Sequence, residues 1–200
     1  MFWDKVAGVY DVFTHVINRK ASLGMRDAVA ALIGSDDEVL ECACGTGLLT
    51  EAMAGRCKRL TATDFSEKML LQAEKKCRAY GNVSFEQGNI LALDYPDASF
   101  DVVVAANVIH LLDEPYRALS EMHRVCRPGG RLIIPTYMNQ NKRGKTNGFA
   151  QAVGEASDVF KRQFTMESYQ QFFRKAGYAN VEYTLYKGRI PCAVAVITKE

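Results

Sequence analysis

Apolar residues along the chain fall into two kinds of segment, short continuous runs and longer stretches with helical spacing. The continuous runs predict five strands, over residues 39–43, 59–63, 83–87, 100–105 and 131–137. The helical spacing predicts helices over residues 47–55, 67–80, 115–126 and 165–176, with another near 149–157. This alternation of strand and helix from residue 37 onward predicts an α/β fold around a mostly parallel sheet.

The two ends of the chain depart from this alternation. Residues 4–33 have a helical pattern before the first strand. Two last strands, near 180–187 and 190–198, are joined by Lys187-Gly188-Arg189, which is typical of a short hairpin turn. We therefore expect a single domain over residues 1–200 whose parallel sheet ends in an antiparallel pair.

Composition restricts the class of protein. The chain has 200 residues, 48% hydrophobic and 24% charged, which is enough for one packed core. A net charge of +2 provides no strongly basic face for nucleic acid. No apolar run approaches the ~20 residues that a membrane span needs, and Met1–Lys5 lacks the basic-then-apolar order of a secretory signal. We therefore expect a cytoplasmic protein with no membrane span.

Six cysteines are scattered through the predicted core elements, which favours reduced, partly buried thiols over a disulfide framework. Cys42 and Cys44 form a C-x-C pair, the spacing that some metal sites use. No second Cys/His pair with zinc-like spacing accompanies them, and successive residues of a strand point to opposite faces. We expect no metal site.

The segment Val39–Gly47 leads from a hydrophobic run through a tight turn of small residues into a helical pattern. Ala43, Gly45 and Gly47 lack bulky side chains, so a ligand can approach the backbone there. Asp64 ends the next apolar run, where its carboxylate can accept hydrogen bonds from ribose hydroxyls. The pattern predicts a nucleoside-binding site.

Five motifs, in this order, resemble those of the class I S-adenosylmethionine-dependent methyltransferases, especially the small enzymes of ubiquinone and menaquinone biosynthesis. They are Glu41–Gly47, Thr63–Ser66, Gly88–Ile90, Phe100–Val104 and Arg127–Gly130. The resemblance covers residues 37–136 and reaches the two ends by architecture alone. It implies a Rossmann-like, seven-stranded sheet of order 3-2-1-4-5-7-6 with an antiparallel last strand. It also implies S-adenosylmethionine as methyl donor, with S-adenosylhomocysteine as product.

The resemblance implies a role for each matching residue of the donor site. Glu41 and the backbone after it hold the methionine part, Asp64 binds the ribose, and Phe65 and Met69 flank the adenine. Asn89 stands where the family often has an aspartate that reads the adenine edge. The full set is Tyr10, Glu41, Ala43, Cys44, Gly45, Gly47, Asp64, Phe65, Met69, Gly88, Asn89, Ile90, Ala106 and Asn107.

Several of these roles have a structural alternative. Glu41 can be a surface charge at a strand end, and Phe65 and Met69 can be core residues. Asn89 can simply stabilise a turn. Tyr10 belongs to an N-terminal segment that folds over the donor as a lid in the resembling family, but its aromatic residues can also form the core of an amphipathic helix.

The sequence departs from the family pattern at one residue, and one other class of ligand has to be considered. The family usually has glycine where Ala43 stands, so a positive φ at this residue would be strained. A nicotinamide-dependent oxidoreductase is the main alternative, because Asp64 follows the turn by about 20 residues in that fold too. The Glu41 carboxylate argues against it, since a pyrophosphate would be repelled at close range.

His110 is the candidate for chemistry. It lies three residues after Asn107 at the carboxyl edge of the fourth strand, and a neutral imidazole there could take a proton from the acceptor. A histidine packed at the sheet edge explains the same position equally well. Many methyl transfers need little help from a base, since alignment of the reacting atoms supplies much of the rate.

The acceptor is expected to be a small molecule, because Ala106-Asn107-Val108-Ile109 lacks the Pro-Pro-aromatic run of enzymes that methylate bases or glutamine amides. We expect it to bind beneath an N-terminal helical lid, residues 1–33, and a substrate-side insertion, residues 138–178. Two alternatives remain, a macromolecular acceptor such as tRNA or protein, and a non-catalytic donor-binding subunit. The assembly is expected to be a monomer or a homodimer.

Overall fold

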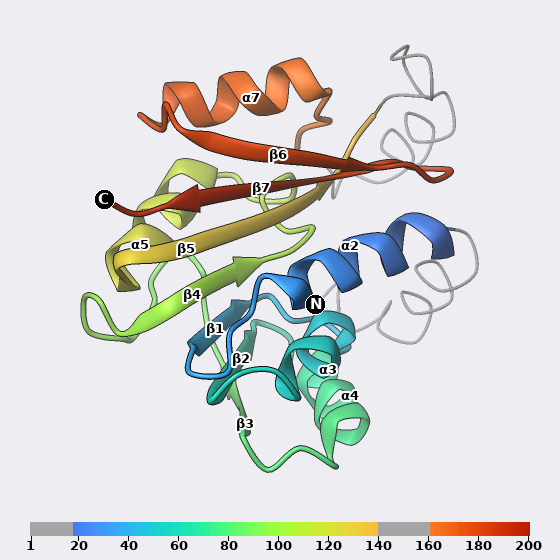
Figure 1. Ribbon diagram of the computed structural model, residues 1–200, viewed down its shortest axis with the longest axis vertical. Coiled ribbons are helices and arrows are strands. Elements are labelled where there is room, and N and C mark those ends of the chain that lie inside the picture. Colours follow the sequence, from blue (N-terminus) through green and yellow to red (C-terminus); the bar gives the residue numbers. More distant parts are fainter. Residues whose placement is uncertain (1–17, 140–160) are drawn as a thin grey trace.

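The computed structural model describes residues 18–139 and 161–200, and these residues form one seven-stranded sheet flanked by helices (Figure 1). The strands are β1 (Glu38–Cys42), β2 (Arg59–Asp64), β3 (Val83–Gln87), β4 (Phe100–Ala105), β5 (Cys126–Tyr137), β6 (Val181–Tyr186) and β7 (Cys192–Thr198). The helices are α2 (Arg19–Ala31), α3 (Leu48–Ala54), α4 (Glu67–Cys77), α5 (Pro115–Val125) and α7 (Met166–Lys175).

The sheet has the order β3-β2-β1-β4-β5-β7-β6, as the resemblance implies. Strands β1 to β5 pair in parallel, and β7 runs antiparallel between β5 and β6. From β1 the chain winds outward through β2 to β3 and then returns to place β4 on the other side of β1. In open sheets of this kind, ligands bind at the carboxyl ends of the strands where the winding reverses. The fold therefore places a binding site at the ends of β1 and β4.

Helices cover both faces of the sheet. On one face α2 and α3 pack over β1 and β4 through a core that includes Met25, Met53 and Val104. On the other face α5 and α7 pack over β4, β5 and β7, with Leu119 and Phe173 fully or almost fully buried. Since both faces are covered, the central strands are apolar almost throughout, and residues 102–105 of β4 are all buried.

Local signals set the ends of several helices. The Ser66 hydroxyl accepts a hydrogen bond from the Met69 backbone N–H at 3.3 Å, which confirms Ser66 as the N-cap of α4. At the start of α7, Thr165 and Ser168 each bond to the other's backbone N–H, forming a capping box. Pro115 occupies the first turn of α5, where its missing N–H costs nothing.

The fifth strand begins earlier than predicted. Pro128-Gly129-Gly130 was expected to be a turn before a strand starting at Arg131, yet the strand runs from Cys126. Its register with β4 shifts, because Phe100 pairs with Cys126 while Val102 pairs with Arg131. Between these pairs β5 has more residues than β4, and the excess residues bulge out of the ladder. Among them, the backbone N–H of Gly129 bonds to the Lys199 carbonyl at 2.7 Å. The glycines thus interrupt the ladder without ending the strand.

The predicted peripheral segments are described in part. Residues 1–17 of the expected lid and the helix expected near 149–157 lie outside the described residues. Within the expected insertion, α7 is a core helix whose Tyr169 and Phe173 are fully buried, so this part of residues 138–178 stabilises the sheet. Among the described helices, none is long and apolar enough to cross a membrane.

Candidate functional site: a cavity at the ends of β1 and β4

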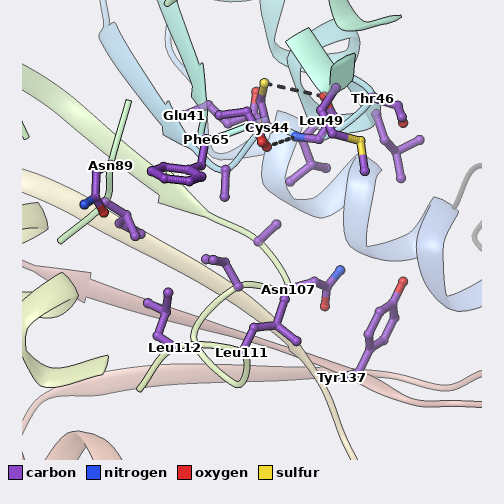
Figure 2. A pocket seen from close by; sticks show the side chains of 18 of the residues that line it. Glu41, Cys44, Thr46, Leu49, Phe65, Asn89, Asn107, Leu111, Leu112 and Tyr137 are labelled. Carbon is purple, nitrogen blue, oxygen red and sulfur yellow. Dashed lines mark hydrogen bonds between the residues drawn. The ribbon is translucent and has the colours of Figure 1, made fainter. Parts of the chain in front are cut away.

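A cavity of about 520 Å³ opens where the winding of the sheet reverses. Figure 2 shows its two walls: Glu41, Cys44 and Thr46 lie on one side, and Leu111, Leu112 and Tyr137 on the other. The lining residues are Met25, Glu41, Ala43, Cys44, Gly45, Thr46, Leu48, Leu49, Asp64, Phe65, Met69, Asn89, Ile90, Leu91, Ala106, Asn107, Val108, Leu111, Leu112 and Tyr137. This set includes eleven of the predicted donor-site residues.

The first wall is built by the turn after β1. Ala43 and Gly45 have φ values of 55° and 56°, in the left-handed region. A Cβ added at Gly45 would meet no atom within 4 Å, so the space beside this backbone is open to a ligand. Ala43 carries the strain expected of a non-glycine residue in that conformation, on the order of 1 kcal/mol.

Asp64 fixes this turn from the end of β2. Its Oδ2 accepts a hydrogen bond from the Gly45 backbone N–H at 2.9 Å, and its Oδ1 accepts one from the Ser66 N–H at 2.8 Å. The carboxylate therefore joins the turn after β1 to the start of α4 and presents its charge at the cavity. Such a held carboxylate suits a ligand with ribose hydroxyls.

Glu41 is a buried acid at the end of β1. Its side chain is 2% exposed, and its Oε2 accepts a hydrogen bond from the Thr50 hydroxyl at 2.6 Å. Burial raises the pKa of the Glu41 carboxyl to about 8; the Thr50 hydrogen bond opposes this rise, and the nearby Asp64 charge adds to it. The structure thus rules out the alternative of a surface charge. A cationic group in the cavity would favour the ionised form of this acid.

Beside Asp64 the cavity has an apolar strip suited to a flat ring. Met69 and Phe65 both line the cavity; Met69 is buried, whereas Phe65, visible in Figure 2, is 52% exposed. Asn89 also lines the cavity, and its Oδ1 accepts a hydrogen bond from the Leu91 backbone N–H at 3.0 Å. The turn-stabilising interpretation of Asn89 therefore holds alongside its place in the cavity wall.

Two predicted glycines lie outside the cavity lining. Gly47 begins α3 with a φ of 83°, and a Cβ there would come within 3.0 Å of the Ala73 backbone. At Gly88 a Cβ would come within 3.1 Å of the Thr63 Cβ. Both positions require a small residue so that neighbouring elements can pack, and neither is among the residues that face the ligand space.

His110 is likewise absent from the lining. It is 4% exposed, and burial lowers the pKa of its imidazole to about 3, with the Arg162 charge adding to the effect. The turn over residues 108–111, closed by the Leu111 N–H bond to the Val108 carbonyl at 2.8 Å, places His110 in the protein interior. This location supports the packing interpretation of His110 over a role as base.

The second wall comes from the loop after β4 and from α2. Asn107 has a φ of 53°, and its backbone N–H bonds to the Pro135 carbonyl at 2.8 Å. Its Oδ1 is buried without a hydrogen-bond partner among the described residues. Tyr137 is the other polar side chain of this wall. The remaining side chains are apolar: Met25, Val108, Leu111 and Leu112.

Sequence reasoning missed this wall almost entirely. Tyr137 could have been found, because it ends a parallel strand at the same edge as Asn107. Met25 lies on a helix whose apolar face serves mostly as core, so no signal distinguishes it from Val29. Tyr10 was predicted to contact the ligand and lies outside the described residues.

The two thiols of the C-x-C pair lie on opposite sides of the sheet. Cys42 packs with the cluster beneath α5, and Cys44 with Leu70 and Ala73 of α4. They are too far apart to act as a pair of ligands to one metal. Alternation along a strand does not explain this, since residues two apart share a face; Cys44 instead follows the end of β1, after Ala43 with its φ of 55°. All six cysteines are free thiols in the structure.

Comparison with known proteins agrees with this geometry. Residues 40–134 match the methyltransferase domain family. The ubiquinone/menaquinone biosynthesis C-methyltransferase of Bdellovibrio bacteriovorus is 30% identical over 213 residues, which cover 94% of this chain and 90% of that protein. The phosphatidylethanolamine N-methyltransferase of Cereibacter sphaeroides is 36% identical over 127 residues, covering 62% of each.

A solved structure shares the fold along nearly the whole chain. The S-adenosylmethionine-dependent methyltransferase of Thermotoga maritima superposes with a TM-score of 0.77 at 24% identity. The alignment covers 99% of this chain and 98% of that one.

Proposed function

Because the chain belongs to the class I S-adenosylmethionine-dependent methyltransferases of the ubiquinone/menaquinone biosynthesis type and uses S-adenosylmethionine as methyl donor, we propose that it methylates a small, largely apolar acceptor. The observation that carries this proposal is the second wall of the cavity. Leu111 and Leu112 lie opposite the turn after β1 (Figure 2), and Met25 and Val108 add further apolar surface to the cavity. Such a surface suits a hydrocarbon or aromatic acceptor better than a polar macromolecule.

The first wall fits the donor. Asp64 would accept hydrogen bonds from the ribose hydroxyls, and Phe65 and Met69 would contact the adenine. Glu41 would face the amino group of the methionine part, whose positive charge compensates a buried carboxylate. The open space beside Gly45 leaves room for this part of the ligand.

When bound, S-adenosylmethionine would supply a methyl carbon made electrophilic by its positively charged sulfur, so that a nucleophile in line with the C–S bond takes the methyl group and S-adenosylhomocysteine leaves. The protein's part is to align the two reactants and exclude water. The apolar side chains of Leu111 and Leu112 would exclude water from the acceptor side. Asn107 and Tyr137 are the polar side chains of that wall, and they would orient a hydroxyl or carbonyl group of the acceptor.

A reduced naphthoquinone is the acceptor that we propose to test first. One similar protein is named for ubiquinone and menaquinone biosynthesis, and another for methylation of phosphatidylethanolamine. A naphthoquinol has a flat apolar ring for the leucines and two hydroxyls for the polar pair. Its hydroxyls also make the ring electron-rich, so a ring carbon is already nucleophilic. Such an acceptor depends less on a base from the protein.

The test is a labelling experiment with four acceptors. The purified protein is incubated with methyl-labelled S-adenosylmethionine and either 2-geranyl-1,4-naphthoquinol, phosphatidylethanolamine vesicles, total tRNA or a protein extract. We expect label in the naphthoquinol. Label in tRNA or protein would contradict the proposal, and label in the phospholipid would replace the quinol by another apolar acceptor. No label in any arm, with S-adenosylhomocysteine still bound, would point to a non-catalytic subunit.

A further inference from the structure

Arg162 holds three carbonyl groups of the loop that forms the second wall. Its backbone N–H donates to the His110 carbonyl at 3.2 Å. Its guanidinium Nη1 donates to the Ile109 carbonyl at 2.9 Å and to the Leu112 carbonyl at 2.6 Å. One residue, 50 positions further along the chain than Leu112, thus binds three carbonyl groups of this loop.

The loop that Arg162 holds shapes the cavity directly. It connects β4 to α5 over residues 106–114, and the side chains of Val108, Leu111 and Leu112 line the cavity. Within the loop, the Leu111 N–H bonds to the Val108 carbonyl, and the Asn107 N–H bonds to β5. The carbonyls at positions 109, 110 and 112 instead point toward Arg162. A change at Arg162 therefore acts on the backbone behind the apolar side chains.

Arg162 is itself fixed from the core side. The chain that carries it is joined to the end of β5 by a bridge between Met138 and Phe164, and the Asn139 N–H bonds to the Phe164 carbonyl at 2.7 Å. Phe164 is buried against Tyr169 and Phe172 of α7. The guanidinium is thus anchored to the helix layer, independently of the turn after β1.

We propose that Arg162 is a positioning residue for the methyl acceptor: it fixes the loop after β4 and so sets acceptor affinity while leaving donor affinity unchanged. The inference rests on the proposed function, since it assumes that the acceptor contacts Val108, Leu111 and Leu112. The donor residues Glu41 and Asp64 belong to β1 and β2, and within residues 18–139 and 161–200 the hydrogen bonds of Arg162 reach neither strand.

The geometry requires arginine in particular. A single terminal nitrogen with two hydrogens donates to two carbonyls, and the planar guanidinium fixes their relative direction. Lysine at the same position would keep the charge, but its flexible stem and compact ammonium lack the planar fork that fixes the direction of the two bonds. We therefore expect Arg162→Lys to rescue only part of the function that Arg162→Gln loses.

The test compares Arg162→Gln and Arg162→Lys with Lys161→Gln as matched control. Lys161 is the adjacent cation, and its ammonium pairs at 3.2 Å with Asp113 of the same loop; this ion pair is exposed and therefore contributes little to holding the loop. We expect Arg162→Gln to raise the KM for 2-geranyl-1,4-naphthoquinol at least tenfold and Arg162→Lys about threefold. In all three variants kcat should stay within threefold, and the Kd for S-adenosylhomocysteine within twofold, of wild type.

Hydrogen exchange reports on the same loop without any acceptor. In Arg162→Gln, the amides of a peptide covering residues 106–114 should exchange at least tenfold faster, while Lys161→Gln leaves them unchanged. Unchanged exchange in Arg162→Gln, or an unchanged KM despite faster exchange, would overturn the inference. A parallel loss of S-adenosylhomocysteine binding would also overturn it, because Arg162 would then serve the whole fold.

The two proposals can fail separately. If the wild-type protein transfers no methyl to the naphthoquinol, the proposed acceptor is wrong, and the exchange measurement alone decides the role of Arg162. If the wild type turns the naphthoquinol over and the Arg162 variants match it in KM, the proposed function stands and the role of Arg162 falls.

Discussion

The Asp64 carboxylate accepts a hydrogen bond from the Gly45 backbone N–H at 2.9 Å, and this contact joins the two turns that end β1 and β2. This bond holds the turn after β1 in the conformation that leaves space beside Gly45. Because the same carboxylate also bonds to the Ser66 N–H, both of its oxygens have a structural task. Asp64 therefore fixes the conformation of the site and also contributes a negative charge to it.

Replacing Asp64 by Asn should weaken donor binding. An amide has one acceptor oxygen where the carboxylate has two, so one of the two backbone bonds is lost together with the charge. We expect the Kd for S-adenosylhomocysteine, measured by calorimetry, to rise at least tenfold. The same change at the exposed Asp36 serves as control, and equal affinities of the Asp64 variant and wild type would refute the assignment.

The buried Glu41 makes stability depend on pH in the absence of donor. Since folding raises its pKa from 4.5 to about 8, the folded state retains a proton that the unfolded state loses above pH 4.5. Stability from this group is therefore full below pH 4.5 and falls as pH rises through about 8. Glu41→Gln should remove this dependence, and at pH 9 it should be more stable than wild type by about 2 to 5 kcal/mol.

Urea unfolding at pH 5, 7 and 9 measures this effect. Glu51→Gln, the same substitution at an exposed position of α3, should follow the wild-type curve. A Glu41→Gln protein with the wild-type pH dependence would show that Glu41 ionises freely in the folded state.

His110 should not titrate in the reaction. With a pKa lowered to about 3, its imidazole stays neutral near pH 7. We expect His110→Asn to leave the shape of the pH profile of kcat/KM unchanged, with His123→Asn on α5 as control. If His110→Asn, but not His123→Asn, loses the acidic or the basic side of that pH profile, His110 acts as a base in the reaction.

Ala43 stores backbone strain that glycine would relieve. Its φ of 55° favours glycine, as does the φ of 54° at Ala98, which does not line the cavity. Each Ala→Gly substitution should raise the free energy of unfolding by about 0.5–1 kcal/mol, since relief of strain exceeds the added freedom of the unfolded chain. In Ala43→Gly the Kd for S-adenosylhomocysteine should stay within threefold; a tenfold change would mean that the methyl group of Ala43 contacts the donor.

Leu111 tests the acceptor wall itself. Leu111→Gln places an amide among apolar side chains, so an apolar acceptor should bind at least fivefold more weakly by KM, with donor affinity unchanged. Leu71→Gln, on the exposed face of α4, is the matched control. If Leu111→Gln binds the naphthoquinol as wild type does, the acceptor lies elsewhere.

The sequence predicts the central strands well because their apolar runs have sharp boundaries. The strands over residues 83–87 and 100–105 have the predicted bounds, the strand predicted over 59–63 extends one residue further, and the one predicted over 39–43 lies one residue earlier. The start of β5 was wrong because Pro128-Gly129-Gly130 has the composition of a turn, and only the pairing partner shows that the strand continues through it.

The turn after β1 and the carboxylate of Asp64 are predictable from the sequence, because their motif is local. The orientation of individual side chains is not. A glycine that makes room for a ligand cannot be told from one that makes room for a helix, so Gly45 and Gly47 look alike in the sequence. His110 follows Asn107 by three residues, but the intervening turn decides whether its ring faces the cavity. The hydrogen bonds of Arg162 span 50 residues, and no local pattern indicates them.

A single-turnover experiment tests most directly whether this cavity brings a methyl donor and an apolar acceptor together. The protein is mixed with one equivalent of methyl-labelled S-adenosylmethionine, 2-geranyl-1,4-naphthoquinol is added, and label in the organic phase is followed with time. We predict transfer of about one methyl group per protein, slowed in Leu111→Gln while S-adenosylhomocysteine binding is retained. Label that remains on the donor in the wild-type protein would contradict the proposed function.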